Sequence, residues 1–469
     1  MIPRAPGLRP LLVAEIVSTT GAAMTAIALP WLVLSTTGSP ARAGLVAAVE
    51  WLPMALLGIP SGTLAARLGP LRTMILCDLA RVHVVAAVPL LHWLGALDLA
   101  PLLVLAFLTG AFFPAHLASQ RIILPGLLGE AAGEVTRGNA VMGAANRLPL
   151  VLGPALGGAL IAAIGPAEVL LADAATYGVS ALLLIAFVPE RAAGVTAPEA
   201  GGDVWAGARA LARSAALRPL TLANSGIELA MQALFLALPI LVFTEYDRSA
   251  ALAGALIAAW GAGALAGTAL ALRLASHPPL TLVRAAMLAQ ALPLFVVASP
   301  LPPPFLAAGM LLSGLANPVV NAPSFTLVTL AVPPRLRAKA MLAFLTAALT
   351  AGGAGLFLTG PAAEAFGARQ VILAAALLST ACAVGFALAT LGARRDIVAR
   401  TITRTRVIEA PCSSTASTTS PPSPRTPTAT STSTRACSAS ASSRSPSTRT
   451  TPPSTTSSMA TSTPTPAST

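Results

Sequence analysis

Apolar stretches of about 20 residues recur along the first 390 positions, separated by short segments that carry turn residues and arginines. A helix of about 20 apolar residues is long enough to cross the roughly 30 Å hydrocarbon core of a bilayer. Because the bilayer holds no water to bind backbone groups, such stretches must become helices. Only 10% of the residues are charged, whereas soluble proteins have about 25%. We therefore expect an all-α protein that crosses the membrane many times.

Turn residues and charges divide the chain into twelve predicted spans. They cover residues 10–34, 42–66, 72–95, 99–127, 136–164, 167–189, 217–243, 249–275, 280–300, 304–332, 338–363 and 368–391. The longest internal connection follows the sixth span. We therefore predict an N-terminal six-helix bundle (1–189), a central loop (190–216) and a C-terminal six-helix bundle (217–392). Within the loop, VWAGARALARSAAL favours a short amphipathic helix on the membrane surface.

The last part of the chain, residues 393–469, has a different composition, dominated beyond about residue 411 by Ser, Thr and Pro with scattered Arg. Such a segment cannot bury enough apolar surface to offset its chain entropy, so we expect disorder. A shifted reading frame in an arginine- and alanine-rich gene typically gives the same composition. We assign no function to this tail.

The basic residues indicate the orientation of the chain. If the N-terminus is cytoplasmic, seventeen basic residues fall on the cytoplasmic side, and only Arg42, Arg248 and Arg369 fall on the outer side. Cytoplasmic loops of membrane proteins carry an excess of Lys and Arg. We therefore predict a multi-pass protein of the cytoplasmic membrane with both termini inside. The net charge of +12 is then a topology signal and not a sign of nucleic-acid binding.

Glycines spaced four apart recur in every third span. Such spacing lets two helices approach closely in lipid. Its recurrence in spans 2, 5, 8 and 11 indicates a three-helix unit used four times, which is the architecture of major facilitator transporters. The glycines are Gly58 and Gly62, Gly153 and Gly157, Gly263 and Gly267, and the looser cluster Gly352, Gly353 and Gly355.

The segment GTLAARLGPLR (62–72) resembles the signature loop between helices 2 and 3 of the major facilitator superfamily, G-x-L-a-D-R-x-G-r-[rk]. Ala66 stands where the family usually has Asp. The resemblance implies twelve helices in two pseudo-symmetric halves, with Arg67 making gating contacts in one access state. The alternative is that the two arginines only anchor the loop inside. The matching residues are Gly62, Leu64, Arg67 and Gly69, with Arg72 as a further basic position.

Other segments are similar to further motifs of the superfamily, and the resemblance covers about residues 8–392. LGPALGG resembles the motif of its antiporters. CDLAR, LLADAATY, NPVVNAPS and PPRLRAKA resemble the macrolide-efflux and siderophore-exporter branch. We expect Asp78 and Arg81 to pair with each other or with a gate helix. The residues concerned are Gly153, Pro154, Gly157 and Gly158 in the first motif, and Asp78, Arg81 and Asp173 in the next two.

Polar and charged residues inside the spans are candidates for a transport pathway, because a charge at mid-bilayer costs about 2.5–3.5 kcal/mol. Glu228 lies near the middle of the seventh span and shares a helical face with Asn224 and Gln232. The resemblance places spans 1, 7 and 10 around a central cavity. The other candidates are Asn146 and Arg147 in span 5, Asn317 and Asn321 in span 10, Glu15 and Thr19 in span 1, and Glu50 and Asp173 as alternative proton carriers.

Three hypotheses for Glu228 remain open. A carboxyl in a low-dielectric cavity can exchange a proton near neutral pH, and an approach by Arg147 would modulate that exchange. Alternatively, Arg147 and Glu228 form a permanent structural pair, or these groups bind substrate without proton coupling. His83 and His116 are interpreted as packing or hydrogen-bonded groups.

Several function classes are disfavoured. A phosphate-binding loop needs G-K-[ST], and the only lysine, Lys339, sits in AKA. There is no HExxH, GxSxG or Cys/His cluster, so we predict no enzyme, no metal and no cofactor. We predict a monomeric, proton-coupled exporter of a small amphipathic compound (a drug, natural product or siderophore). The alternatives are uptake or lipid flipping by the same fold, or a non-transporting sensor or assembly protein.

Overall fold

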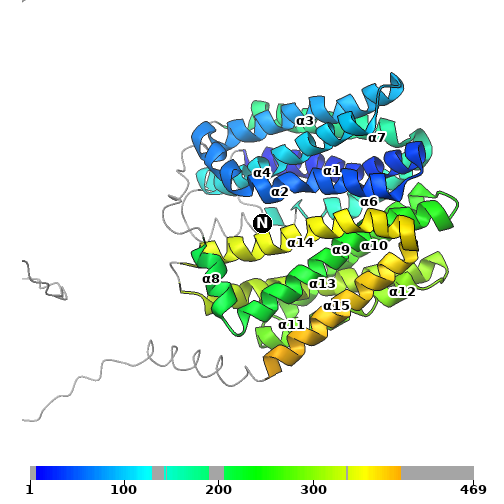
Figure 1. The fold of residues 1–469 in the computed structure, drawn as a ribbon. Coiled ribbons are helices and arrows are strands. Elements are labelled where there is room, and N and C mark those ends of the chain that lie inside the picture. The colour runs from blue at the N-terminus through cyan, green and yellow to red at the C-terminus, as the bar shows by residue number, and fades with distance from the viewer. Residues whose placement is uncertain (1–6, 129–141, 144, 190–204, 334–335, 392–469) are drawn as a thin grey trace, which may run out of the picture. The chain divides into compact units, whose positions relative to one another are not determined.

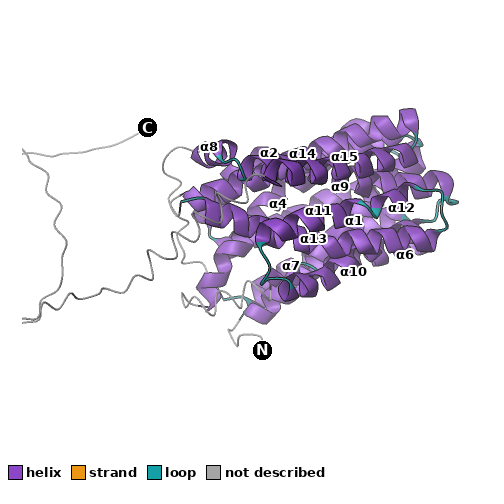
Figure 2. Cartoon of the chain, turned by 90° about the horizontal axis from the view of Figure 1, so that it is seen from below, coloured by secondary structure: helices purple, strands orange, loops and turns teal. Residues whose placement is uncertain are grey.

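The computed structural model describes residues 7–128, 142–143, 145–189, 205–333 and 336–391 (Figure 1). Within these ranges every regular element is a helix, and no strand occurs (Figure 2). Residues 190–204 of the central loop and the tail at 393–469 lie outside the described residues. The predictions made for them stay predictions.

Each predicted span contains a helix. Ten helical regions are long and apolar enough to cross a membrane; the two remaining predicted spans are α2 and the shorter α6. The first six spans are α1 (Leu8–Thr37), α2 (Pro40–Leu68), α3 (Pro70–Trp93), α4 (Leu99–Leu128), α6 (Pro149–Ile164) and α7 (Pro166–Phe187). The second six are α9 (Leu217–Glu245), α10 (Ala250–Arg273), α11 (Pro279–Ala291) with α12 (Leu294–Ala298), α13 (Pro303–Ala331), α14 (Arg337–Phe366) and α15 (Ala368–Leu391).

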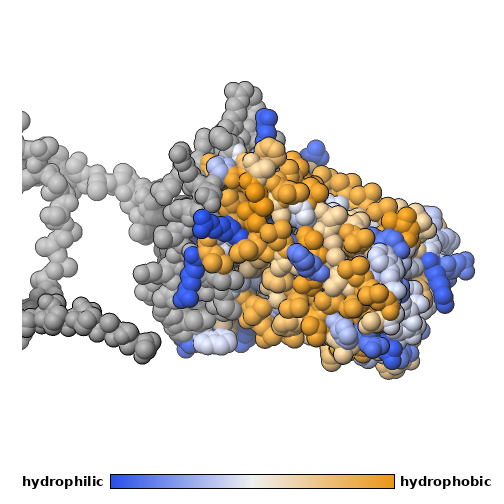
Figure 3. All heavy atoms as spheres, turned by 90° about the horizontal axis from the view of Figure 1, so that it is seen from above, coloured by the Kyte–Doolittle hydropathy of each residue, from blue (hydrophilic) through white to orange (hydrophobic). Residues whose placement is uncertain are grey.

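Apolar side chains cover most of the face drawn in Figure 3, and hydrophilic residues gather toward its two ends. Many large apolar side chains of the spans are exposed, such as Leu182 at 67% and Leu388 at 63%. A soluble protein would bury them, whereas lipid solvates them. The chain is a multi-pass membrane protein.

Two spans are interrupted. In the fifth, α6 begins only at Pro149, after a turn at residues 146–148. In the ninth, α11 ends before Leu292 and Pro293, where α12 takes over. Proline lacks a backbone N–H and its ring crowds the carbonyl four residues earlier, so Pro149 and Pro293 each remove a helical hydrogen bond at the break.

A single glycine connects the two helices of three consecutive pairs. Gly69 joins α2 to α3, Gly165 joins α6 to α7, and Gly367 joins α14 to α15, with φ of 86°, 99° and 90°. Other residues rarely adopt this backbone conformation. The same connection between spans 2 and 3, 5 and 6, and 11 and 12 is consistent with a repeated three-helix unit.

The two halves meet along two helix pairs, α2 with α14 and α6 with α10 (Figure 1). Glycines make these contacts close. A Cβ atom added to Gly44 would lie 2.6 Å from the Cα of Gly360, and one added to Gly158 would lie 2.8 Å from the Cα of Gly254. The glycines predicted from their spacing mostly make other contacts: Gly153 and Gly157 pack against α1, and Gly263 and Gly267 pack against α13, each pair within its own half.

We name the two ends of the bundle by their residues. The arginine-rich end is where α1 begins and α2 ends, and it carries Arg67, Arg72, Arg273 and Arg337. The latch end is where α2 begins and α14 ends. There, the Glu364 carboxylate accepts hydrogen bonds from the Ser39 hydroxyl at 2.8 Å and the Ala41 backbone N–H at 3.0 Å, which join the two halves.

The expected amphipathic helix forms as α8 (Ala206–Arg213), packed against α9 and α14. Gly207 and Leu211 are its buried residues. A Cβ atom at Gly207 would come 2.2 Å from the backbone oxygen of Lys339, so α8 lies directly on the first turn of α14.

Candidate functional site

A cavity of about 400 Å³ lies between the two halves. Its wall combines helices from both, namely α1 and α6 with α9, α10 and α13. The lining residues are Ala23, Ala26, Ile27, Leu150, Pro154, Glu228, Met231, Gln232, Phe235, Ile257, Trp260, Asn317 and Asn321. Spans 1, 7 and 10 therefore line the cavity together with spans 5 and 8.

The polar groups of the cavity come from α9 and α13. The Glu228 carboxylate accepts a hydrogen bond from the Gln232 amide at 2.9 Å, and the Asn321 amide donates to the Asn317 oxygen at 3.1 Å. These four residues were predicted from their spacing of four, which places each pair on one helical face. Asn224 is half-buried on α9 and is not among the residues that line the cavity.

Two aromatic rings form the apolar part of the cavity. Phe235 and Trp260 meet edge to face, with ring centroids 5.0 Å apart. The buried indole N–H of Trp260 has no hydrogen-bond partner within the described part of the chain. Buried polar groups are nearly always paired, so this donor is available to a bound molecule. The cavity thus offers a carboxylate, amides, one free donor and aromatic surface.

Arg147 does not join Glu228. It lies half-buried in the turn before α6, and no ion pair between the two residues occurs in the described structure. The hypothesised permanent pair is therefore not formed here: Arg147 lies in the turn that precedes α6 and is not among the residues that line the cavity with Glu228. Its neighbour Asn146 accepts a hydrogen bond from Gln120 of α4 at 3.3 Å.

A second polar cluster is buried inside the N-terminal half. His116 of α4 lies between two carboxylates, with its Nε2 3.1 Å from Glu15 Oε2 and its Nδ1 3.3 Å from Asp78 Oδ1. The other oxygen of Asp78 accepts a hydrogen bond from the Ser180 hydroxyl at 2.7 Å. The predicted candidate Thr19 donates to the Glu15 backbone oxygen on its own helix. The hydrogen-bonded interpretation of His116 holds, but its two charged partners were not foreseen.

Arg81 and Asp173 continue this cluster. The Arg81 guanidinium lies over the rings of Phe113 and Tyr177, at 5.7 and 5.2 Å from their centroids. No ion pair joins it to Asp78 among the described residues, so the first of the two expected pairings is not formed in this state; Asp78 contacts His116 of α4 and Ser180 of α7 instead.

Asp173 of α7 accepts a hydrogen bond from Thr25 of α1 at 2.5 Å. Asp173 and Arg81 both interact electrostatically with Glu50, which is half-buried on α2. Of the acids expected in the pathway, only Glu228 lines the central cavity.

Comparison with known proteins settles the family. The model of the Major Facilitator Superfamily matches residues 11–355. The chain belongs to this superfamily. It is a transporter and not an enzyme.

Among its relatives, the multidrug efflux pump Tap of Mycobacterium tuberculosis is 29% identical over 379 residues, covering 78% of this chain and 89% of Tap. A variant of the nucleoside transporter NupG matches with a TM-score of 0.67 at 14% identity, over 81% of this chain and 99% of that one. A bacterial homologue of the lysosomal transporter Spinster, inward-facing and unoccupied, matches with a TM-score of 0.62 at 16% identity, over 82% and 96%. The two structures are similar in fold.

The superfamily signature loop closes α2 at the arginine-rich end. Arg67 is exposed in the last turn of α2, Gly69 is the single-residue connection, and Arg72 is exposed at the start of α3. The surroundings of Gly62 and Leu64 lie outside the described part of the structure. The gating role of Arg67 stays a prediction.

The antiporter-like segment packs span 5 against both halves. A Cβ atom at Gly153 would collide with Ala23 of α1, one at Gly157 would lie in tight contact with Met24 of α1, and Gly158 faces Gly254 of α10. Pro154 lines the cavity. The segment therefore holds α1, α6 and α10 close together beside the cavity.

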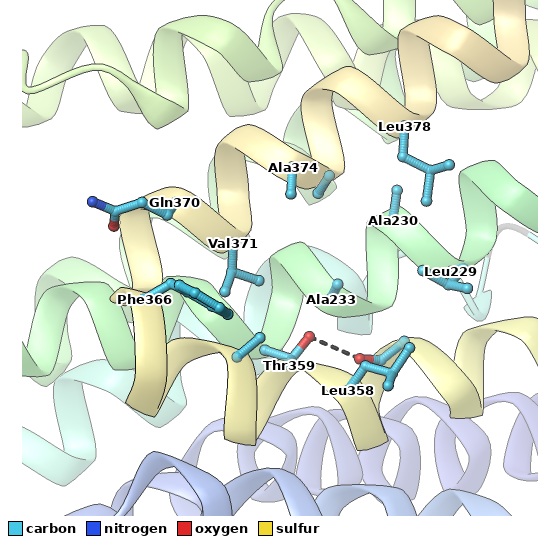
Figure 4. A pocket seen from close by; sticks show the side chains of 13 residues that line it. Leu229, Ala230, Ala233, Leu358, Thr359, Phe366, Gln370, Val371, Ala374 and Leu378 are labelled. Atoms are coloured by element: carbon cyan, nitrogen blue, oxygen red, sulfur yellow. Dashed lines mark hydrogen bonds between the residues drawn. The ribbon is translucent and has the colours of Figure 1, made fainter.

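A second hollow of about 450 Å³ lies between α9, α14 and α15 (Figure 4). Its lining is apolar except for Gln370 and Thr359, and the Thr359 hydroxyl already donates to the Gly355 backbone oxygen. All three helices belong to the C-terminal half. A substrate site of this fold lies where the two halves meet, so the central cavity is the candidate site.

Proposed function

We propose that this transporter exports small amphipathic cations, driven by the proton gradient. Two facts support the proposal: its relatives at 29% identity are named multidrug efflux pumps, and its central cavity combines one carboxylate with aromatic surface. Cations bind favourably near carboxylates and over aromatic rings in sites shielded from water.

The proposal depends mainly on Glu228 in the central cavity. It is the one charged residue among those that line the cavity, and its hydrogen bond from Gln232 leaves further acceptor positions on the carboxylate. The two asparagines and the Trp260 N–H can bind polar atoms of a substrate, while Phe235 and Trp260 contact its apolar part. Such a site favours compounds with one positive charge on a hydrophobic frame.

We place the arginine-rich end in the cytoplasm, because basic residues accumulate on that side. The latch end then faces outward, and its glycine contacts and the Glu364 hydrogen bonds hold it closed. The chain would accept substrate from the cytoplasm in this state and release it after the two halves rock apart at the latch end. Glu228 or one of the buried acids of the N-terminal half exchanges the proton.

Expression in a bacterial host that lacks its own drug pumps tests the proposal. We expect lower accumulation of ethidium and reduced susceptibility to a set of amphipathic cations, and loss of both on Glu228→Gln. Asp98→Asn, an exposed acid before α4, is the matched control and should retain activity. Higher ethidium accumulation than in the empty host would indicate uptake. No movement of any compound, with the protein present in the membrane, would favour a sensor or assembly protein.

A further inference from the structure

Among the residues that the structure describes, a cluster in the N-terminal half buries more carboxyl groups than cationic groups. Glu15, Asp78 and Asp173 are at most 4% exposed and Glu50 is half-buried. The cationic groups that face them are Arg81 and His116, both 4% exposed. With all six ionised, the cluster would carry a net charge of −2. An unbalanced charge is costly inside a membrane protein, so the cluster is neutral only with protons bound to its carboxyl groups.

The groups around His116 come from every helix packed on this cluster. α1 supplies Glu15, α3 supplies Asp78 and Arg81, α7 supplies Asp173 and Tyr177, and α2 supplies Glu50. Cys77 on α3 is close enough to be affected by the charges of Asp78 and Arg81.

The contacts of His116 are incomplete in this state. The pair from its Nε2 to Glu15 is a hydrogen bond, whereas its Nδ1 and Asp78 Oδ1, although 3.3 Å apart, lack hydrogen-bond alignment. The Arg81 Nε also has no hydrogen-bond partner in the described structure. Buried polar atoms left unpaired are uncommon. The imidazole therefore has two carboxylates between which a proton can be redistributed by a small movement of α3 or α4.

The cluster also extends along the membrane normal. Glu15 and Thr25, which binds Asp173, are ten residues apart on α1, or about 15 Å at 1.5 Å per residue. This distance is about half of the roughly 30 Å hydrocarbon core. Titratable groups thus reach from the level of Glu15 toward the latch end without entering the central cavity.

Helix α1 connects the cluster to the cavity. It carries Glu15 and Thr25, and it lines the cavity with Ala23, Ala26 and Ile27. A change in the charge of the cluster changes how α1 packs against α3, α4 and α7. Because α1 also lines the cavity, such a change would reach the cavity wall.

We propose that Glu15, His116 and Asp78 bind the proton that is exchanged for substrate, and that Glu228 serves the substrate site. This inference rests on the proposed function. In each cycle one proton enters the triad from water on one side and leaves to water on the other, and no bond other than that to the proton forms or breaks. His116 passes the proton between the two carboxylates.

Nitrogen-15 NMR of histidine-labelled, purified transporter tests proton binding without any substrate. The chain has four histidines, and His116→Gln identifies the signal of interest by its loss. We expect the His116 ring to change protonation state within the pH range over which the purified transporter stays folded. Glu15→Gln and Asp78→Asn should move the midpoint, and Glu228→Gln should leave it unchanged. A single protonation state throughout, or a midpoint indifferent to both N-terminal variants, would overturn the proposal.

Proteoliposomes loaded with ethidium separate coupling from transport. We expect Asp78→Asn and His116→Gln to move ethidium down its own gradient but to lose uphill movement driven by an imposed pH gradient, whereas Glu228→Gln loses both. Downhill movement also shows that the variants are folded. The control is His83→Gln, an exposed ring bonded to the Leu79 carbonyl. Uphill movement by Asp78→Asn would refute the inference alone. If the wild type moves no ethidium, the proposed function fails, and the NMR result still decides proton binding.

Discussion

Gly254 on α10 faces Gly158 on α6 near the latch end, in a contact with no room for a side chain. A Cβ atom added to Gly254 would lie 2.3 Å from the Pro154 carbonyl oxygen and 2.8 Å from the Gly158 Cα, whereas ordinary contacts begin at 3.4 Å. Gly254→Ala therefore requires α6 and α10 to separate locally by about 1 Å. Because backbone atoms form the obstacle, no side-chain rotation can relieve the clash.

The substitution penalises the closed latch end and leaves the open one unaffected. Overpacking by a methyl group in a tight contact costs about 1–3 kcal/mol. If all of this cost falls on the closed state, the ratio of open to closed molecules rises about 5- to 150-fold. The exporter would then spend more of its time open at the latch end, and its turnover would fall.

Spin labels at Thr37 of α1 and Thr244 of α9, both exposed at the latch end, report this shift. In a background without the native cysteines, pulsed electron resonance should show a new, longer distance in Gly254→Ala. The matched control is Gly385→Ala on α15, where nothing lies within 4 Å of the added atom. An unchanged distance distribution in Gly254→Ala, together with wild-type transport, would refute the reasoning.

Three further changes follow from local geometry. Gly69→Ala forces a side chain into a positive φ of 86° and should destabilise the transporter by about 1–2 kcal/mol, measured as a lower Tm; an unchanged Tm would argue against strain. Trp260→Phe keeps the contact with Phe235 but removes the unpaired N–H. In a binding titration, it should weaken the binding of compounds that have a hydrogen-bond acceptor by about 0.5–1.5 kcal/mol. Compounds without an acceptor should bind as before. Glu364→Gln weakens the hydrogen bond from the Ser39 hydroxyl and should open the latch end less than Gly254→Ala does. The effect of Glu364→Gln should become smaller at high salt. A shift that does not depend on salt would speak against an ionic contribution.

The polar lining of the cavity could be predicted from the sequence because its pattern is local. Glu228 with Gln232, and Asn317 with Asn321, are four apart on single helices, and that spacing fixes a common face. The surroundings of Arg147 could not be predicted in this way, because the fifth span is not one uninterrupted helix: a turn at residues 146–148 precedes α6.

The triad around His116 could not be assembled from local patterns. Glu15 is 101 residues away from His116, and the two meet only because α1, α3, α4 and α7 pack together. A weaker signal was nevertheless present. The spans of the N-terminal half hold four acids and few bases away from their ends, and that imbalance already indicates either bound protons or additional partners.

The one-residue connection at Gly69 leaves no slack between α2 and α3. When α2 tilts away from α14 as the halves rock, the first turn of α3 has to follow the end of α2, and α3 carries Asp78 and Arg81 on its buried face. His116 lies on α4, so its distance from Asp78 then depends on whether α2 and α14 are in contact. The short connection at Gly69 thus transmits a movement of α2 at the contact between the halves to the helix that carries two of the protonatable groups.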